Sequence, residues 1–95
     1  MPELEAKLEE RCSQMIKNYG GLALKLAPLG AAGFPDRTVM HAGRVFFIEF
    51  KREKVGRDAL LQSQWVEILG NLGFTVYRVS SMQEFLAVAT QEFVQ

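Results

Sequence analysis

The sequence predicts a small α/β domain in which a mixed β-sheet is flanked by helices, in the order αβββαβα. Three observations predict it: helical periodicity near both ends and once in the middle, β-prone apolar runs between those helices, and glycines where the pattern changes. A chain of 95 residues, 48% hydrophobic and 23% charged, has the size and composition of one globular domain, which we take to be residues 1–95.

The seven elements follow from the residue pattern and from the residues that interrupt it. Gly20-Gly21 ends the first helix and Gly73 ends the second, while Ala42-Gly43 is a tight hairpin connection. Residues 81–84 resemble a capping box, which begins the last helix. The apolar face of that last helix is a candidate surface for a second copy. We expect helices over 3–19, 59–72 and from 82 onward, and strands over 22–27, 38–41, 44–51 and 74–79.

Composition excludes several protein classes. No apolar run approaches the roughly 20 residues of a membrane-spanning helix, and the acidic N-terminus differs from a signal peptide. A single cysteine, Cys12, forms neither an internal disulfide nor a zinc site alone, which fits a reducing cytoplasm. The net charge is zero, yet residues 37–57 hold six cations against two carboxylates, a net of +4. That segment either meets phosphates or is a solvated charged loop.

The most specific pattern combines a turn with an apolar strand. Asp36 follows Gly33-Phe34-Pro35, and thirteen positions later Glu49 and Lys51 interrupt a run of phenylalanine, valine and isoleucine. Side chains two apart in a strand share a face, and buried charges need a partner or an ion. Taken singly, Asp36 suits an Asx-turn and Glu49 with Lys51 suits a surface ion pair. Together, two carboxylates and an ammonium suit a divalent metal that holds a phosphodiester.

An aspartate, about a dozen residues, and then Glu-x-Lys at the end of a hairpin resembles the PD-(D/E)XK nuclease superfamily. Within it, the run K-L-A-P-L-G-A-A-G-F-P-D-R over 25–37 and the run F-F-I-E-F-K over 46–51 resemble the VRR-Nuc (virus-type replication-repair nuclease) domain. Leu61-Gln62, eleven residues before Gly73, fits the same family. The resemblance runs from about residue 5 to residue 85, and it implies a restriction-endonuclease-like core.

The resemblance also implies roles for individual residues. Asp36 and Glu49 would be the carboxylate ligands of Mg²⁺ or Mn²⁺, with the backbone carbonyl of Phe50 beside them. Glu9, on the first helix, would reach the metal directly or through water, and Glu5 one turn earlier is the alternative. The implied catalytic set is Glu9, Asp36, Glu49, Lys51 and Gln62.

Lys51 would hold the attacking water or stabilise charge on the phosphate, and Gln62 would contact either one. DNA phosphates would be bound by cations near the site, for which we name Arg37, Arg52, Lys54 and Arg57. Outside the site, we expect Trp65 and Cys12 in the core and no catalytic role for His41.

The implied activity is a metal-dependent DNA endonuclease that selects branched structures such as junctions, flaps or forks. Stand-alone members of the family occur largely in phages and prophages, which implies replication, repair or packaging in a bacterial cytoplasm. A homodimer would bring two active sites to two strands. The alternative is a DNA-binding or assembly factor that keeps the fold without cleaving.

Overall fold

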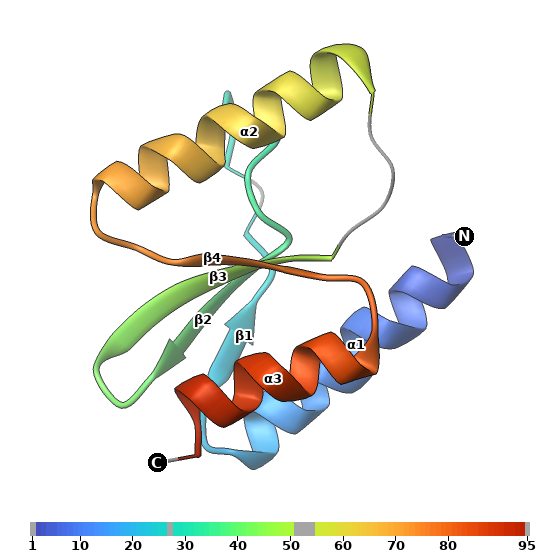
Figure 1. The fold of residues 1–95 in the computed structure, drawn as a ribbon, viewed down its shortest axis with the longest axis vertical. Helices are drawn as coiled ribbons and strands as arrows, with labels where there is room; N and C mark the ends of the chain where they lie inside the picture. Colours follow the sequence, from blue (N-terminus) through green and yellow to red (C-terminus); the bar gives the residue numbers. More distant parts are fainter. Residues whose placement is uncertain (1, 27, 51–54, 95) are drawn as a thin grey trace.

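The computed structural model describes residues 2–26, 28–50 and 55–94, and it has the predicted order of elements. Figure 1 shows the sheet lying between helices on its two faces. The helices are α1 (Pro2–Asn18), α2 (Gly56–Asn71) and α3 (Met82–Glu92), and the strands are β1 (Leu22–Leu24), β2 (Arg37–His41), β3 (Arg44–Phe50) and β4 (Val76–Val79).

The sheet is mixed, as predicted, with the strand order β1-β2-β3-β4. The first three strands pair antiparallel, and β4 pairs parallel to β3. Ala42 and Gly43 form the hairpin turn between β2 and β3 with φ of 51° and 79°. Both values lie in the left-handed region that two-residue hairpin turns require. Helix α2 forms the crossover from β3 to β4.

The side chains of β3 alternate between the two faces of the sheet. Phe46, Ile48 and Phe50 face α1 and α3, and they belong to the main hydrophobic core. Phe47 points to the other face, where its ring contacts Phe34 and Phe74 edge-on. Glu49 lies two residues after Phe47 and therefore points to the same face of the sheet, the face that α2 covers. The remaining buried core residues come from α1, β2, β4 and α3: Cys12, Ile16, Val39, Val79, Phe85, Val88 and Ala89.

The predicted capping box begins α3, with one difference. Ser81 Oγ accepts a hydrogen bond from the Glu84 backbone N–H at 3.1 Å, as expected. The Glu84 carboxylate bonds one residue further back, to the N–H of Ser80 at 2.7 Å and to its hydroxyl at 2.6 Å. The apolar face of α3 packs into the protein's own core through Phe85 and its neighbours. That face is therefore not the surface for a second copy that the sequence suggested.

Helix α2 is the element that departs most from prediction. It begins at Gly56, three residues early, and its buried residues are Gln62 and Leu69. Two large apolar side chains in the segment predicted as this helix, Ile68 and Leu72, remain 45% and 67% exposed. Because α2 covers only part of its face of the sheet, apolar side chains remain at the surface there.

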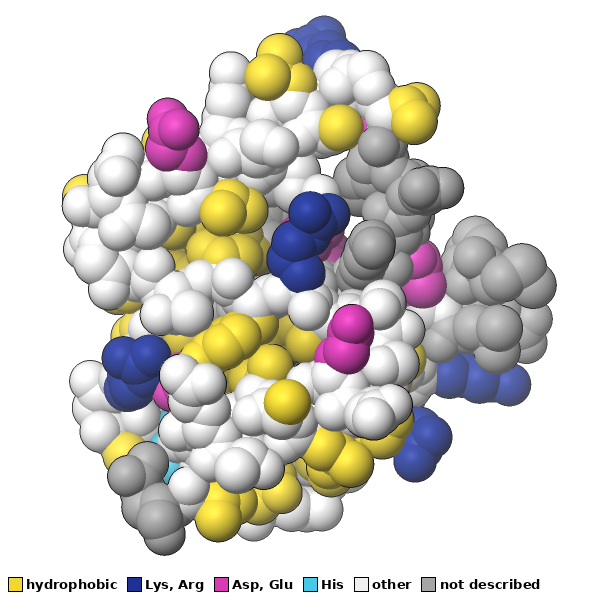
Figure 2. All heavy atoms as spheres, viewed as in Figure 1, with side chains coloured by type: hydrophobic (Ala, Val, Ile, Leu, Met, Phe, Trp, Pro, Cys, Tyr) yellow, Lys and Arg dark blue, Asp and Glu magenta, His cyan; other side chains and the backbone are white. Residues whose placement is uncertain are grey.

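The face shown in Figure 2 carries basic and acidic side chains that are scattered, with hydrophobic side chains between the layers of α2 and α3. Among the described residues, no helix combines the length and the hydropathy of a membrane span.

Candidate functional site

Two predicted site carboxylates lie where β2 begins and β3 ends. The register pairs Arg37 with Ile48, so one further step places Asp36 opposite Glu49. Residues directly opposite in an antiparallel pair have Cβ atoms about 4.5–5.5 Å apart. Asp36 Oδ2 also accepts a hydrogen bond from the backbone N–H of Phe50 at 2.8 Å. That bond holds the Asp36 carboxylate against the end of β3.

Helix α2 completes the surroundings of Glu49. The Glu49 side chain is only 2% exposed, and the Gln62 amide NH₂ donates a hydrogen bond to Glu49 Oε2. Gln62 is itself 5% exposed, although it lies on a helix whose outer surface is largely open. Glu49 and Gln62, two of the predicted site residues, are thus in direct contact, a contact that the sequence alone did not predict. A buried carboxylate requires such a donor, because burial without one is costly.

The loop that precedes Asp36 is fastened to α2. Gly33, with φ of 86°, lies so close to the helix that a Cβ there would be 2.7 Å from the Leu61 carbonyl carbon and 2.9 Å from the Gln62 backbone N. Trp65 Nε1 donates a hydrogen bond to the Ala32 carbonyl at 3.0 Å. The Trp65 ring meets the Phe34 ring edge-on, with centroids 5.2 Å apart. These contacts fix the position of the loop, and so of Asp36, relative to Gln62 on α2.

The described contacts of Glu9 join it to two cations. Its Oε2 accepts from Arg37 Nε at 2.6 Å, and Lys25 Nζ lies 3.5 Å away. Arg37 also donates to the Ala23 carbonyl at 3.0 Å. The Arg37 side chain shares the face of Ile48, where α1 packs, whereas Glu49 faces α2. Among the described contacts, Glu9 joins Arg37 and Lys25 and not the two carboxylates at the end of the hairpin.

The fold of this chain is similar to that of a protein of known structure. A solved chain titled "VRR_NUC domain" is similar over 94% of this chain and 96% of its own length, with a TM-score of 0.77 and 23% sequence identity. This chain has the VRR-Nuc fold. No family model matches the sequence, and no curated protein matches it significantly. The similarity is therefore one of fold, and the predicted restriction-endonuclease-like architecture is confirmed by structure.

The VRR-Nuc fold of this chain offers oxygen donors suited to a hard divalent cation. Asp36 and Glu49 contribute two carboxylates at one end of the hairpin, and Phe50 contributes a backbone carbonyl. Mg²⁺ and Mn²⁺ prefer such ligands and retain several waters. Within the described ranges, no three His, Cys, Asp or Glu side chains form a metal cluster. A metal here would be held by two carboxylates, the main chain and water, with Glu9 outside its immediate ligands.

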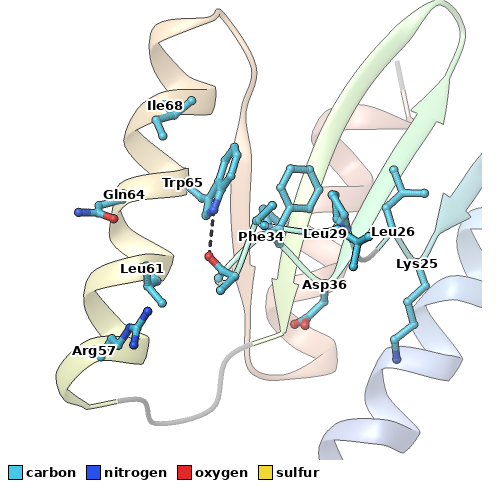
Figure 3. A pocket seen from close by; sticks show the side chains of 16 residues that line it. Lys25, Leu26, Leu29, Phe34, Asp36, Arg57, Leu61, Gln64, Trp65 and Ile68 are labelled. Atoms are coloured by element: carbon cyan, nitrogen blue, oxygen red, sulfur yellow. Dashed lines mark hydrogen bonds between the residues drawn. The ribbon is translucent and has the colours of Figure 1, made fainter.

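A groove of about 870 Å³ begins beside Asp36 and runs between α2 and the preceding loop. Figure 3 shows α2 side chains, including Leu61 and Trp65, as one wall, and the segment that carries Phe34 and Asp36 as the other. Arg57 and Lys25 supply the groove with two cations. The groove is lined mostly by apolar groups, and its acidic end lies at the site.

The remaining predicted residues divide into two groups. Arg57 is exposed at the start of α2 and lines the groove, where a phosphate could approach it. Lys51, Arg52 and Lys54 lie outside the described residues. Trp65 was expected in the core, but it is half-buried and lines the groove, because its ring packs on Phe34 outside the main core cluster. Cys12 is fully buried as expected, and burial raises the pKa of its thiol to about 12.

Sequence reasoning missed one residue in the surroundings of Glu49. Arg78, on β4, pairs with Glu49 in the parallel β3–β4 register. Its Nη2 donates to Gln62 Oε1 at 3.1 Å. The only signal in the sequence was an arginine in an otherwise apolar strand. That arginine can be placed beside Glu49 only when the register of the parallel pair is known.

Proposed function

We propose that this protein is a metal-dependent endonuclease that hydrolyses phosphodiester bonds in DNA. The observation that carries the proposal is the placement of Asp36 and Glu49 at the same end of the hairpin, with Gln62 bonded to Glu49. The VRR_NUC title of the similar structure supports the same assignment. Two carboxylates beside a groove with cations suit a phosphate bridged by a divalent ion.

The chemistry divides among the residues as follows. Asp36 and Glu49 would hold Mg²⁺ or Mn²⁺, and such an ion supplies an activated water and neutralises the charge on the departing oxygen. The Phe50 N–H keeps the Asp36 carboxylate in place, and Gln62 does the same for Glu49. Lys51 follows Phe50 directly, and we assign it the stabilisation of negative charge on the phosphate.

The preferred substrate in this proposal is branched DNA, within phage replication, repair or packaging. Arg57 and Lys25, beside the groove, support contact with the backbone of a strand that enters it. We assign the same role to Arg52 and Lys54. Because such contacts are electrostatic, binding should weaken as salt rises.

Cleavage of labelled junction, flap, fork and linear duplex DNA by the purified chain, with Mg²⁺ or Mn²⁺ and with EDTA, tests the proposal. Glu49→Gln keeps the size of the side chain and removes the charge, and Asp36→Asn keeps an acceptor for the Phe50 N–H. Glu67→Gln, at an exposed carboxylate on α2, is the matched control. Loss of a ligand should cost at least the roughly 10- to 100-fold typical of supporting residues.

Three results would contradict parts of the proposal. Activity of the parent in EDTA would show that cleavage needs no divalent metal. Full activity of Glu49→Gln would show that Glu49 is not part of the site. Equal DNA binding by all variants without any cleavage supports the non-cleaving DNA-binding factor instead. Calorimetric titration with Mn²⁺ gives a reading that is independent of cleavage, since Glu49→Gln should weaken binding and Glu67→Gln should not.

We also propose that the protein acts as a homodimer. Exposed apolar side chains on the α2 side of the sheet support this, with Leu22 57%, Met40 40% and Ile68 45% exposed. Leu22 and Met40 are direct partners across β1 and β2. Sedimentation equilibrium of the parent and of Leu22→Lys measures the association, and a monomeric parent at all concentrations contradicts it.

A further inference from the structure

Arg78 is placed to control the orientation of Gln62. It lies on β4 opposite Glu49, so both side chains project from neighbouring strands toward α2. Gln62 reaches down from α2 between them. Its amide nitrogen donates to Glu49 Oε2, and its amide oxygen accepts from Arg78 Nη2 at 3.1 Å. The three side chains form a continuous series of hydrogen bonds from β3 through α2 to β4.

The two ends of this series have opposite requirements. An ionised carboxylate only accepts hydrogen bonds, and a guanidinium only donates them. An amide satisfies both when its NH₂ faces Glu49 and its oxygen faces Arg78. The reversed amide would set oxygen against the carboxylate and NH₂ against the guanidinium, so both contacts would become repulsive. Arg78 therefore opposes reversal of the Gln62 amide. No described contact joins Arg78 to Asp36.

We propose that Arg78 is a positioning residue that keeps the Gln62 NH₂ directed at the Glu49 carboxylate. The inference rests on the proposed function for its catalytic meaning, since Glu49 is there a metal ligand. Residues that hydrogen-bond to metal ligands orient them and tune their basicity. Arg78 acts one step further out, through the amide, and so supports the direction in which Glu49 presents its oxygens.

A surface role for Arg78 is the competing interpretation. Arg78 is exposed, and with Gln62, Ser63 and Val66 it lines a small hollow of about 150 Å³. An exposed arginine near a nuclease site could simply bind a DNA phosphate. The two roles differ in their effects. Loss of a phosphate contact weakens DNA binding and leaves Gln62 unchanged, whereas loss of a positioning contact changes Gln62 in the absence of DNA.

The test is NMR spectroscopy of the Gln62 side-chain NH₂ in the folded chain without metal or DNA. The signals are assigned by their loss in Gln62→Met. Arg78→Met removes the donor and keeps the aliphatic stem, and Arg78→Lys keeps a group that only donates. Arg11→Met, at an exposed arginine of α1, is the control. Hydrogen exchange of the NH₂ should accelerate about threefold to tenfold in Arg78→Met, as expected for one lost hydrogen bond.

The proposal expects Arg78→Lys and Arg11→Met to stay close to the parent. Unchanged exchange and unchanged NH₂ shifts in Arg78→Met, with dispersed backbone signals, would overturn it. In cleavage assays, Arg78→Met should lower kcat by about tenfold with little change in KM. A rise in KM alone would assign Arg78 to the phosphate instead. If the parent does not cleave DNA, the proposed function fails, and the NMR result still decides whether Arg78 orients Gln62.

Discussion

Replacement of Gly33 by alanine should destabilise the protein and disturb the site together. Gly33 has φ of 86°, and a Cβ there would meet Leu61 Cβ at 2.8 Å and the Gln62 backbone N at 2.9 Å. Both obstacles are main chain or the root of a side chain, so neither moves aside cheaply. Relief requires α2 and the loop to separate, which shifts Gln62 away from Glu49.

The magnitude follows from two separate costs. Left-handed backbone costs an alanine about 1–2 kcal/mol, and the reduced freedom of the unfolded chain returns about 0.4–1 kcal/mol. Forcing a methyl group into packed surroundings adds about 1–3 kcal/mol. Gly30 provides the matched control, since its φ is 75° and a Cβ there would meet no atom within 4 Å. Gly30→Ala carries the first two contributions and lacks the third.

Urea denaturation of the two variants isolates the close approach. Gly33→Ala should be less stable than Gly30→Ala by about 1–3 kcal/mol, a midpoint difference on the order of 1 M urea. Gly33→Ala should also lose cleavage at temperatures where it remains folded, while Gly30→Ala keeps it. Equal stabilities would refute the reasoning, because they would mean that the loop and α2 do not touch at Gly33.

Three further predictions concern other parts of the fold. The hydrogen bond from Arg44 holds the pKa of buried Glu92 below its usual value, so the Glu92 carboxylate stabilises the fold above about pH 4.5 and this stabilisation is lost as pH falls. Glu92→Gln should therefore flatten the acid side of a plot of unfolding free energy against pH. An unchanged acid side would contradict this. Buried Cys12, with a pKa near 12, should react with a disulfide reagent at pH 8 only after unfolding in urea, and rapid native reaction would contradict its burial. Trp65→Phe should cost about 0.5–1.5 kcal/mol in urea denaturation by leaving the Ala32 carbonyl without its donor, and no loss would show that water replaces the bond.

The elements were predictable where their signals are local. The hairpin turn at Ala42-Gly43 and the cap at Ser81 depend on residues a few positions apart, and both are confirmed. The start of α2 was placed three residues late because its N-cap, Val55, makes no side-chain cap hydrogen bond. A helix without a polar cap gives the sequence little to mark its first turn.

The residues of the candidate site likewise differ in whether local sequence determines their positions. Asp36 and Glu49 belong to one antiparallel hairpin, so the pattern of the two strands nearly determines that they share an end. The contact of Glu9 with Arg37 depends on how α1 packs on the sheet, and helix periodicity alone does not specify that docking. Arg78 depends on a parallel register, which a long crossover connection sets and no short turn reveals.

The short hairpin between β2 and β3 and the long crossover between β3 and β4 also suggest the order in which the site residues come together during folding. The two carboxylates are brought together by a two-residue turn, which closes early because short loops lose little entropy. Gln62 and Arg78 arrive only when α2 docks and β4 pairs. We therefore expect a period in folding in which the two acidic groups already lie at one end of an incomplete sheet without the amide and the arginine, and we predict that divalent ions in the refolding buffer speed the last stage.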